Sequence, residues 1–276
     1  MPYHWFLTGA SSGIGRDLAE IILAAGDDLS ATVRKPEALR DLAERYPDQL
    51  VVEQLDVTHT ADIAAVVARA HARRPVDVLV NNAGGGVIGA TEELTDADIE
   101  GQIALNLLAP VHVTRAFIPA MRSRGAGRII QVSSASGQGS LPTSSMYHAA
   151  KWGLEGFSEC LRQELEPFGV FVTLIEPGGV RTGFGRNLHY APASAAYHDT
   201  PAGNIRRMFE NAGDELYTLD PRKIAREIFN VAKSDTPPLR LTLGGDAFGV
   251  IQTALKTRLA FLESQEQLAR SVAFDS

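Results

Sequence analysis

The stretch Thr8-Gly9-Ala10-Ser11-Ser12-Gly13-Ile14-Gly15 stands between a short apolar run and a helical pattern. A turn from a strand into a helix explains its glycines. Gly9 permits a tight turn, Gly13 lets the backbone approach a pyrophosphate, and Gly15 lets the helix pack closely on a sheet. The first N–H groups of the helix would then attract the anion. The spacing is G-x-x-x-G-x-G rather than the commoner G-x-G-x-x-G, so a turn that is merely tight is the alternative.

Short β-rich apolar runs alternate with helical patterns along most of the chain. Strands are expected at residues 3–8, 28–34, 50–55, 76–81, 127–133, 170–176 and 239–243, and helices at 14–25, 36–46, 60–73, 95–124, 144–167, 220–233 and 246–268. Such alternation predicts a doubly wound α/β fold, in which helices cover both faces of a parallel sheet. Because ligands of such sheets bind at the carboxyl ends of the strands, the glycine turn marks the expected binding edge.

The longest expected helix contains Pro110, which should kink or restart it. Residues 177–216 have scattered prolines and glycines and predict a long loop with a short helix near 204–211. Long loops in compact domains are usually binding loops or lids, so this segment is expected to be a substrate lid. Residues 246–276 are expected to form a C-terminal helical extension. No linker or repeat divides the chain, so we expect one domain over residues 1–276.

The composition indicates a globular protein. The 276 residues are 45% hydrophobic and 21% charged, with a formal net charge of -7, a pI near 5.5 and scattered basic residues. Nucleic-acid and membrane binding are therefore not expected. Cys160 is the single cysteine, and the 7 histidines show no metal-ligand spacing, so neither an intrachain disulfide nor a metal site is expected. With no signal-peptide pattern and no apolar run near the ~20 residues of a spanning helix, we expect a cytoplasmic protein.

The residues after the second expected strand bear on the kind of dinucleotide that the turn would bind. A carboxylate there suits a ribose with free hydroxyls, whereas a cation suits a ribose 2′-phosphate. Here Val33 is followed by Arg34, whose guanidinium suits phosphate recognition. We therefore favour NADP(H) over NAD(H). The alternative is that Arg34 and Lys35 only solvate the end of a strand.

Two further strand ends supply candidates for the adenosine half of the cofactor. Asp56 can accept a hydrogen bond from the adenine amino group, and Val57 can lie against the ring. An aspartate at this position also suits a turn or a helix cap. The small residues of Asn82-Ala83-Gly84 would let the backbone pass close to the adenosine.

Tyr147 and Lys151 are four residues apart in a helical pattern and so share one face of that helix. Ser134 follows the fifth expected strand, at the same edge as the glycine turn, and Asn106 lies in the longest expected helix. Alone, a Tyr–Lys pair is more simply explained as an exposed helix pair. Together with Ser134, Asn106 and the turn, it indicates a site for proton transfer. His148 is expected to point away from that helix face.

These pieces together resemble the short-chain dehydrogenases/reductases. The matching residues keep the family's order and spacing over about residues 4–182: Thr8 to Gly15, Asn81 to Gly84, Asn106, Ser134, Tyr147, Lys151, Pro177 and Gly178. The resemblance implies a Rossmann-type domain with about seven parallel strands, NAD(P)(H) as cofactor, and interconversion of a ketone or aldehyde with its alcohol. It also implies a homodimer or homotetramer. The C-terminal extension more weakly resembles hydroxysteroid- or retinol-type reductases.

The resemblance also implies a role for each matching residue. Tyr147 would be the general acid/base, and Lys151 would bind the nicotinamide ribose and lower the pKa of Tyr147. Ser134 would orient the substrate oxygen, and Asn106 would hold a water of a proton relay. One cation about 4 Å away, at an effective dielectric of ~20, supplies about 4 kcal/mol, enough to lower a tyrosine pKa by about three units. Contacts with the cofactor are expected from Gly9, Ser11, Ser12, Gly13, Ile14, Gly15, Arg34, Asp56, Val57, Asn82, Ala83, Gly84, Tyr147, Lys151, Pro177, Gly178, Val180 and Thr182.

The expected lid bears on the substrate. It carries the apolar and aromatic side chains Phe184, Leu188, Tyr190, Tyr197, Ile205, Met208 and Phe209. They favour an apolar or aromatic small-molecule substrate, unless they only pack the lid onto the domain. The lid also carries Arg181, Arg186, Arg206 and Arg207. These cations keep a β-ketoacyl thioester open as the alternative substrate. The alternative of another class is a non-catalytic dinucleotide sensor, which would be expected to lack Tyr147 or Lys151.

Overall fold

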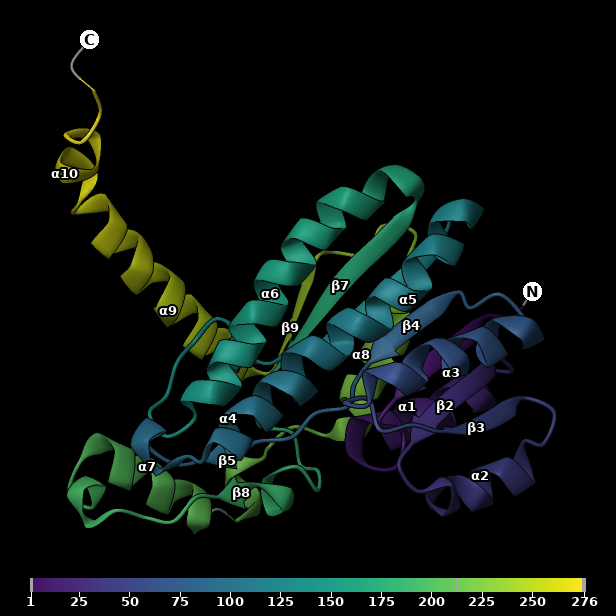
Figure 1. Cartoon of the computed structure of the whole chain (residues 1–276), viewed down its shortest axis with the longest axis horizontal. Coiled ribbons are helices and arrows are strands. Elements are labelled where there is room, and N and C mark those ends of the chain that lie inside the picture. The colour runs from purple at the N-terminus through teal and green to yellow at the C-terminus, as the bar shows by residue number, and fades with distance from the viewer. Residues whose placement is uncertain (1, 212, 275–276) are drawn as a thin grey trace.

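The computed structural model describes residues 2–211 and 213–274 and contains a parallel sheet of seven strands (Figure 1). The strands are β1 (His4–Thr8), β2 (Asp28–Val33), β3 (Leu50–Gln54), β4 (Val78–Asn81), β6 (Gly127–Val132), β7 (Val170–Pro177) and β9 (Arg240–Leu243). Each strand matches a predicted one, which confirms the doubly wound α/β fold. Their order in the sheet is β3-β2-β1-β4-β6-β7-β9, so the order reverses next to β1. A reversal of this kind opens a crevice for ligands at the carboxyl ends of the strands.

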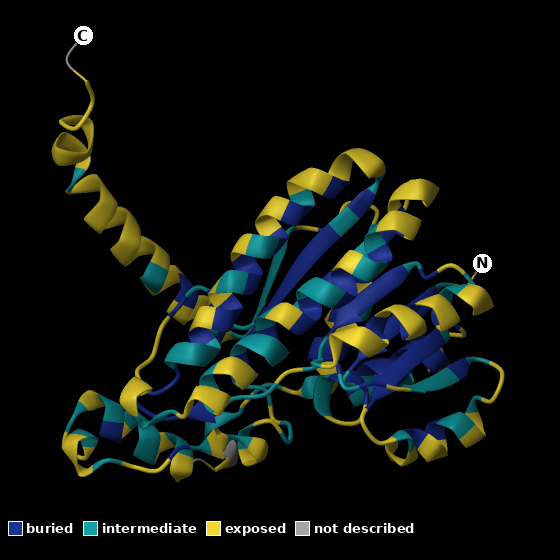
Figure 2. Ribbon diagram, viewed as in Figure 1, coloured by how far each residue is buried: buried dark blue, intermediate teal, exposed yellow. Residues whose placement is uncertain are grey.

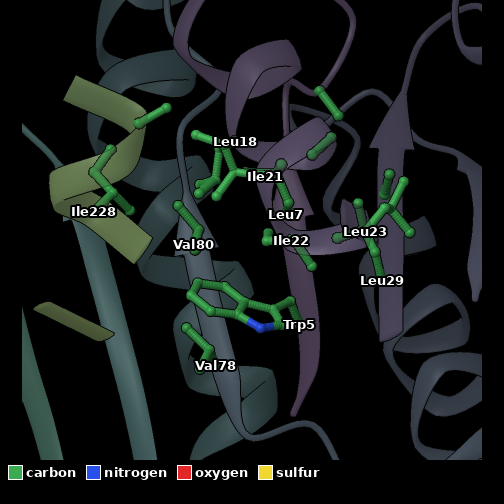
Figure 3. Close-up of a cluster of buried hydrophobic side chains, with 14 of the residues drawn as sticks. Trp5, Leu7, Leu18, Ile21, Ile22, Leu23, Leu29, Val78, Val80 and Ile228 are labelled. Carbon is green, nitrogen blue, oxygen red and sulfur yellow. The ribbon is translucent and has the colours of Figure 1, made fainter. Parts of the chain in front are cut away.

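Successive residues of the central strands face two different hydrophobic cores, as the two-residue period of a strand requires. Trp5 and Leu7 of β1 are fully buried in one core, where Ile228 packs on the same side of the sheet (Figure 3). Phe6, between them in the sequence, is buried in the other core and lies 4.8 Å from Phe117, measured between ring centroids. The sheet is therefore covered on both faces, and only its edges remain open.

The helices divide between these two cores. On the first face lie α1 (Gly13–Ala24), α2 (Arg40–Arg45) and α8 (Pro221–Ala232). On the second face lie α3 (Thr60–Arg73), α5 (Ala109–Arg124) and α6 (Ser145–Leu165). The helix α4 (Asp96–Ile103) precedes α5 and packs beside α6. This arrangement places the N-terminus of α1 and the start of α6 at the same edge of the sheet.

The longest helical segment runs from Asp96 to Arg124 and contains a π-helical turn at Ala104–Leu108. Pro110 follows this turn and has no N–H to donate to the carbonyl of Asn106, so the interruption expected at Pro110 takes the form of the π turn. By length and composition alone, these 29 residues could cross a membrane, although they contain no continuous apolar run of spanning length. In the fold, Phe117 is fully buried against the sheet.

The segment after β7 contains more regular structure than a loop. A two-residue strand, β8 (His189–Tyr190), pairs in parallel with β5 (Val87–Ile88), and α7 (Pro201–Glu210) begins beyond the N-cap Thr200. The predicted helix over 246–268 is wrong in one respect, because it is divided into α9 (Gly245–Glu263) and α10 (Glu266–Arg270). Figure 1 shows α9 and α10 projecting away from the rest of the chain.

Candidate active site

A cavity of about 970 Å³ lies at the carboxyl ends of the strands. It brings together segments that are far apart in the sequence, as expected for a crevice at a point where the strand order reverses. Its lining contains every predicted site residue except Gly13 and Gly15: Gly9, Ser11, Ser12, Ile14, Arg34, Asp56, Val57, Asn82, Ala83, Gly84, Asn106, Ser134, Tyr147, Lys151, Pro177, Gly178, Val180 and Thr182.

The glycine turn is tightly fitted against the end of β4. Gly9 has a φ of +69°, which glycine adopts at little cost, and a Cβ on Gly15 would lie 2.3 Å from the carbonyl oxygen of Gly9. The side chain of Asn82 donates hydrogen bonds of 3.0 Å to the carbonyl oxygens of Thr8 and Gly9. Thr8 in turn accepts from the backbone N–H groups of Asn82 and Ala83. Asn82 therefore holds the turn through its side chain, a contribution that its small size alone did not predict.

The start of α1 is suited to an anion. The hydroxyl of Ser12 makes no capping hydrogen bond to this helix within the described residues, so the side chain leaves the first N–H groups of α1 uncapped. Gly13 has a φ of +54°, and a Cβ there would lie 3.0 Å from the side chain of Thr182. The turn and the segment after β7 thus close around one space, where a pyrophosphate would meet the positive end of the helix.

The ends of β2 and β3 form the opposite end of the cavity. Arg34 follows β2 and is exposed, with its guanidinium available to a ligand phosphate. Asp56 accepts hydrogen bonds from the backbone N–H of Thr58 at 3.0 Å and from its hydroxyl at 2.7 Å, and these hydrogen bonds lower the pKa of Asp56. Asp56 therefore has the turn-capping role considered as the alternative, while it also lines the cavity.

Tyr147, Lys151 and Ser134 meet at the centre of the cavity. The phenol of Tyr147 lies close enough to the hydroxyl of Ser134 for Ser134 to lower the pKa of the phenol. The ammonium of Lys151 donates a 2.9 Å hydrogen bond to the carbonyl oxygen of Val132 and lies 5.7 Å from the centroid of the Tyr147 ring. Tyr147 and Lys151 come from consecutive turns of α6, and Ser134 comes from the end of β6. The arrangement can hold a carbonyl oxygen between two hydroxyl groups, with a buried cation beside them.

Asn106 is almost fully buried, and its side-chain amide is engaged with the backbone after β4. It donates to the carbonyl oxygen of Gly85 at 3.0 Å and accepts from the N–H of Gly85 at 3.3 Å. It also donates to the carbonyl oxygen of Gln102. These bonds fix the π turn against one wall of the cavity, and they commit the amide to positioning the chain.

Burial acts strongly on the pKa values of Tyr147 and Lys151, which the sequence-based expectation did not include. Desolvation raises the pKa of Tyr147 to about 12, and only the hydrogen bond with Ser134 acts in the opposite direction. Desolvation likewise lowers the pKa of Lys151 to about 8, opposed by the charge of Glu155. Burial therefore dominates the pKa of Tyr147, and the lowering of this pKa by Lys151 stays a prediction. Partial removal of both side chains from water favours the neutral form of each.

The remaining wall of the cavity is apolar. Phe184 packs over the site, with its ring centroid 5.9 Å from that of Tyr147. Further large apolar side chains line the same wall: Leu141, Leu188, Met208, Phe209, Leu216 and Val250. Of the expected lid residues, Tyr190, Tyr197 and Ile205 are absent from the described lining. Two of the lid arginines bond elsewhere, since Arg206 donates to the carbonyl oxygen of Ala191 and Arg207 to that of His198.

His148 lines the cavity, contrary to the expectation that it points away. Its Nδ1 donates to the carbonyl oxygen of Ser144 at 2.8 Å, and its Nε2 accepts from the N–H of Leu141 at 3.2 Å. Burial lowers the pKa of His148, which favours this neutral tautomer. The position of His148 next to Tyr147 in the sequence does not predict this orientation, because the hydrogen bond with Leu141 depends on how the loop before α6 folds back.

The match to a family model is decisive for the class of protein. Residues 4–192 match the model described as short chain dehydrogenase. The chain belongs to the short-chain dehydrogenase family. It is therefore an NAD(P)-dependent oxidoreductase, and a non-catalytic sensor is no longer a competing interpretation.

Curated relatives match over most of the chain. Oxidoreductase BOA17 of Botryotinia fuckeliana is 35% identical over 272 residues, which are 98% of each chain. Human 17-beta-hydroxysteroid dehydrogenase type 1 is 40% identical over 251 residues, covering 85% of this chain and 75% of that protein. Both relatives are named as oxidoreductases or dehydrogenases, but their names do not state a common substrate.

Solved structures agree with the fold. A short-chain dehydrogenase from Streptomyces avermitilis superposes with a TM-score of 0.92 at 39% identity, covering 99% of this chain and 100% of the other. A metagenomic short-chain oxidoreductase in complex with NADP has a TM-score of 0.70 at 27% identity, covering 88% of this chain and 97% of the other. Nicotinamide dinucleotides are thus bound by proteins that share this fold.

Proposed function

We propose that the protein is an NADP(H)-dependent carbonyl reductase, or secondary-alcohol dehydrogenase, for an apolar or aromatic small molecule. The observation that carries the proposal is the meeting of Tyr147, Ser134 and Lys151 beneath an apolar wall that includes Phe184. The polar groups at the base can hold a carbonyl oxygen. The wall above them suits the apolar body of the substrate.

The lining residues fit a nicotinamide dinucleotide. The uncapped start of α1 and Gly9 would hold the pyrophosphate, Arg34 a 2′-phosphate, and the segment Pro177 to Thr182 the nicotinamide half. The bound cofactor supplies the hydride in reduction and accepts it in oxidation. The preference for NADP(H) rests on Arg34, because no carboxylate stands directly after β2 to meet a free ribose hydroxyl.

The chain's own residues handle the proton. In reduction, Ser134 orients the substrate oxygen, and the phenol of Tyr147 gives its proton to that oxygen as the carbonyl carbon is reduced. A raised pKa of Tyr147 keeps the proton in place at neutral pH, which suits a proton donor. In oxidation the phenolate must form, and the charge of Lys151 stabilises it. A relay beyond Lys151, through a water held near Asn106, stays a prediction.

The substrate half of the cavity favours a neutral substrate. The cationic side chains in the described lining are Arg34, at the adenosine end, and Lys151, at the base. The described apolar wall adds no further cation, which favours an uncharged ketone over a carrier-bound thioester.

A substrate panel tests this proposal. Purified protein with NADPH would be mixed separately with apolar aromatic ketones, small polar ketones and a β-ketoacyl thioester, and loss of reduced-nicotinamide absorbance would be followed. We expect the highest kcat/KM with the aromatic ketones. Comparable turnover of the thioester would overturn the substrate class, and no turnover of any carbonyl compound despite NADPH binding would overturn the activity.

A further inference from the structure

The helix α9 has one apolar side, which is covered only at the start of the helix. There it packs on the body of the protein, where Ala247 is fully buried and Ile251 is 7% exposed. Further along this side, the guanidinium of Arg258 lies 4.7 Å from the centroid of the Trp152 ring. The start of α9 also forms part of the cavity wall. Asp246 accepts a 2.7 Å hydrogen bond from the N–H of Gly179, and Val250 lines the cavity.

Beyond this contact, the apolar side of α9 is uncovered. Leu255, Leu259 and Leu262 are 49%, 55% and 65% exposed. Figure 2 shows most of α9 in the colour of exposed residues. Their spacing of four and then three residues places them in one stripe, as in the seam of paired helices. Single exposed leucines are ordinary, but an aligned row on a projecting helix leaves a continuous apolar surface in water. The stripe, which we call the leucine seam, has the pattern that binds another helix.

The charges beside the leucine seam indicate which helix would bind to it. Lys256 and Glu263 are seven residues apart, so they lie on the same flank of the seam. Neither forms an ion pair with another described residue. An antiparallel second copy of α9, centred near Leu259, would bring Lys256 of each copy beside Glu263 of the other. In a parallel pair, the same flank of each copy would lie on opposite sides of the seam, so Lys256 and Glu263 of the two copies would not meet.

The overall charge of α9 and α10 does not favour a lipid surface. The basic residues Lys256, Arg258 and Arg270 are matched by the acidic residues Asp246, Glu263 and Glu266. A helix that binds an anionic membrane is rich in lysine and arginine on its polar face. Self-complementary charge beside an apolar seam instead suits a symmetric contact between copies.

We propose that α9 pairs with α9 of a second copy of this chain, antiparallel and through the leucine seam. This contact does not depend on association through any other surface of the protein. Because the start of α9 lies against Gly179 and the cavity, the contact would also steady one wall of the site.

Sedimentation velocity and light scattering test the seam directly. The double substitution Leu259→Glu and Leu262→Glu should halve the mass of the assembly, whether or not other faces also associate. Thr253→Glu, on the other side of the helix, is the matched control and should leave the mass unchanged. An unchanged mass in the double variant would overturn the proposal, as would a wild-type protein that is monomeric at every concentration yet binds anionic vesicles through these leucines.

Charge reversal tests the orientation. Lys256→Glu and Glu263→Lys should each weaken self-association by about tenfold in Kd, since each places like charges together, and the two together should restore it. In the background Cys160→Ser, Leu259→Cys should form a disulfide-linked dimer on oxidation. If the double charge reversal weakens association further, the antiparallel arrangement is wrong.

A separate observation concerns the buried carboxylate behind the reacting groups. Glu155 lies one helical turn after Lys151 and is 5% exposed. One of its oxygens accepts a 2.5 Å hydrogen bond from the hydroxyl of Ser133, and the other lies 2.9 Å from Nε of Arg240. Ser133 immediately precedes Ser134. The carboxylate therefore connects α6 with the end of β6 directly behind the Tyr147 site.

The surroundings of Glu155 are highly charged for a protein interior. Glu176 is fully buried on β7 and shares Arg240, and Glu159 on α6 bonds to the same guanidinium. Desolvation and the charge of Glu176 raise the pKa of Glu155 to about 7, although Ser133 and Arg240 oppose them. The charge of Glu155 also acts on Lys151, whose own pKa it raises against the effect of burial.

On the basis of the proposed function, we infer that Glu155 is a positioning residue for the proton transfer. It holds Ser133, and through the chain Ser134, against the end of β6. It also supplies the negative charge that keeps Lys151 protonated. Arg240 stabilises the ionised form of Glu155 from the opposite side.

Glu155→Gln tests this role, because it removes the charge and keeps the shape. The lysine signals of ¹⁵N-lysine-labelled protein, assigned with a Lys151→Arg variant, should show Lys151 losing its proton at a lower pH than in the wild type. Glu159→Gln removes an exposed carboxylate from the same Arg240 and should leave Lys151 unchanged. An unchanged Lys151 titration in Glu155→Gln would overturn the inference whether or not the protein turns over a ketone.

Activity gives the second readout. In Glu155→Gln, kcat should fall about tenfold with the KM for ketone unchanged, and the alkaline limb of the pH profile should move to lower pH. Glu155→Asp should recover part of the loss. A fall in thermal stability with kcat and the pH profile unchanged would show a structural role only and would contradict the inference.

Discussion

The two halves of the cavity are built in different ways. The cofactor half consists of backbone turns and short polar side chains at the ends of β1 to β4, where Asn82 ties the glycine turn in place. The substrate half consists of large apolar side chains that arrive from separate segments, among them Phe184, Met208 and Val250. The first half depends on local turn geometry, whereas the second depends on which side chains meet across long distances in the sequence.

This difference has a functional consequence. Backbone groups that contact a dinucleotide can serve any substrate, because they do not touch it. The apolar wall is in contact with the substrate and can vary without disturbing the cofactor. Changes in the cofactor half should therefore affect all substrates alike, and changes in the lid should affect only some of them.

The largest effect is expected at Lys151, where the cofactor half and the substrate half of the cavity meet. Lys151→Met removes the buried cation but keeps much of the side-chain volume. We expect kcat to fall by about 10³-fold for every ketone, because loss of a proton-transfer group typically has effects of ~10²–10⁴-fold. Steady-state kinetics with several ketones would measure this. A loss confined to one ketone would contradict the division between the halves.

A smaller effect is expected at the adenosine end. Arg34→Ala should raise the KM for NADPH by about 10- to 100-fold and leave that for NADH nearly unchanged, since a charge-assisted hydrogen bond contributes ~1.5–3 kcal/mol. Kinetics with both cofactors would measure the ratio. Lys35→Ala is the neighbouring control. Equal losses with NADPH and NADH would show that Arg34 does not read the 2′-phosphate.

A more selective effect is expected in the lid. Phe184→Ala removes the ring that packs near Tyr147 and should raise the KM for aromatic ketones by about tenfold, as loss of apolar pocket contacts costs ~1–3 kcal/mol. The Kd for NADPH, measured by cofactor fluorescence, should stay unchanged. Phe168→Ala, at an exposed ring far from the cavity, is the control. Weakened NADPH binding in Phe184→Ala would break the separation of the two halves.

The smallest effect is expected from pH near neutrality. Lys151 is charged below its pKa of about 8 and neutral above it. The effect of its charge on proton transfer by Tyr147 is therefore present at neutral pH and is lost as the pH rises through 8. The profile of kcat/KM for NADPH, which reports the free enzyme, should therefore be flat near pH 7 and fall above about pH 8. A profile that stays flat to pH 10 would contradict the low pKa.

The fold and the cofactor half were largely predictable from the sequence because both leave periodic or local signals. Each strand of the seven-stranded sheet is a short apolar run, and Gly9 and Gly15 occupy a turn that tolerates no side chain. Ser134, Tyr147 and Lys151 could be placed together because a sheet edge and a helix period fix their positions. Their roles in catalysis rest on the resemblance and await the experiments above.

The missed features depend on contacts between distant segments. The two-residue strands β5 and β8 are too short to show a period, and they form because the lid returns to the chain after β4. The Glu155 network joins α6, β7 and β9, and a lone glutamate on a helix gives no sign that it is buried. The sequence also gave no sign of how strongly burial raises the pKa of Tyr147, because that burial comes from segments distant in the sequence.

The central claim is that Tyr147 is the proton donor in a site that binds its cofactor independently. Tyr147→Phe removes only the phenolic oxygen, so NADPH binding and ketone reduction should be measured together in that variant. We predict a Kd for NADPH within about twofold of the wild type and a kcat lower by about 10³-fold. Full turnover by Tyr147→Phe with an aromatic ketone would contradict the account.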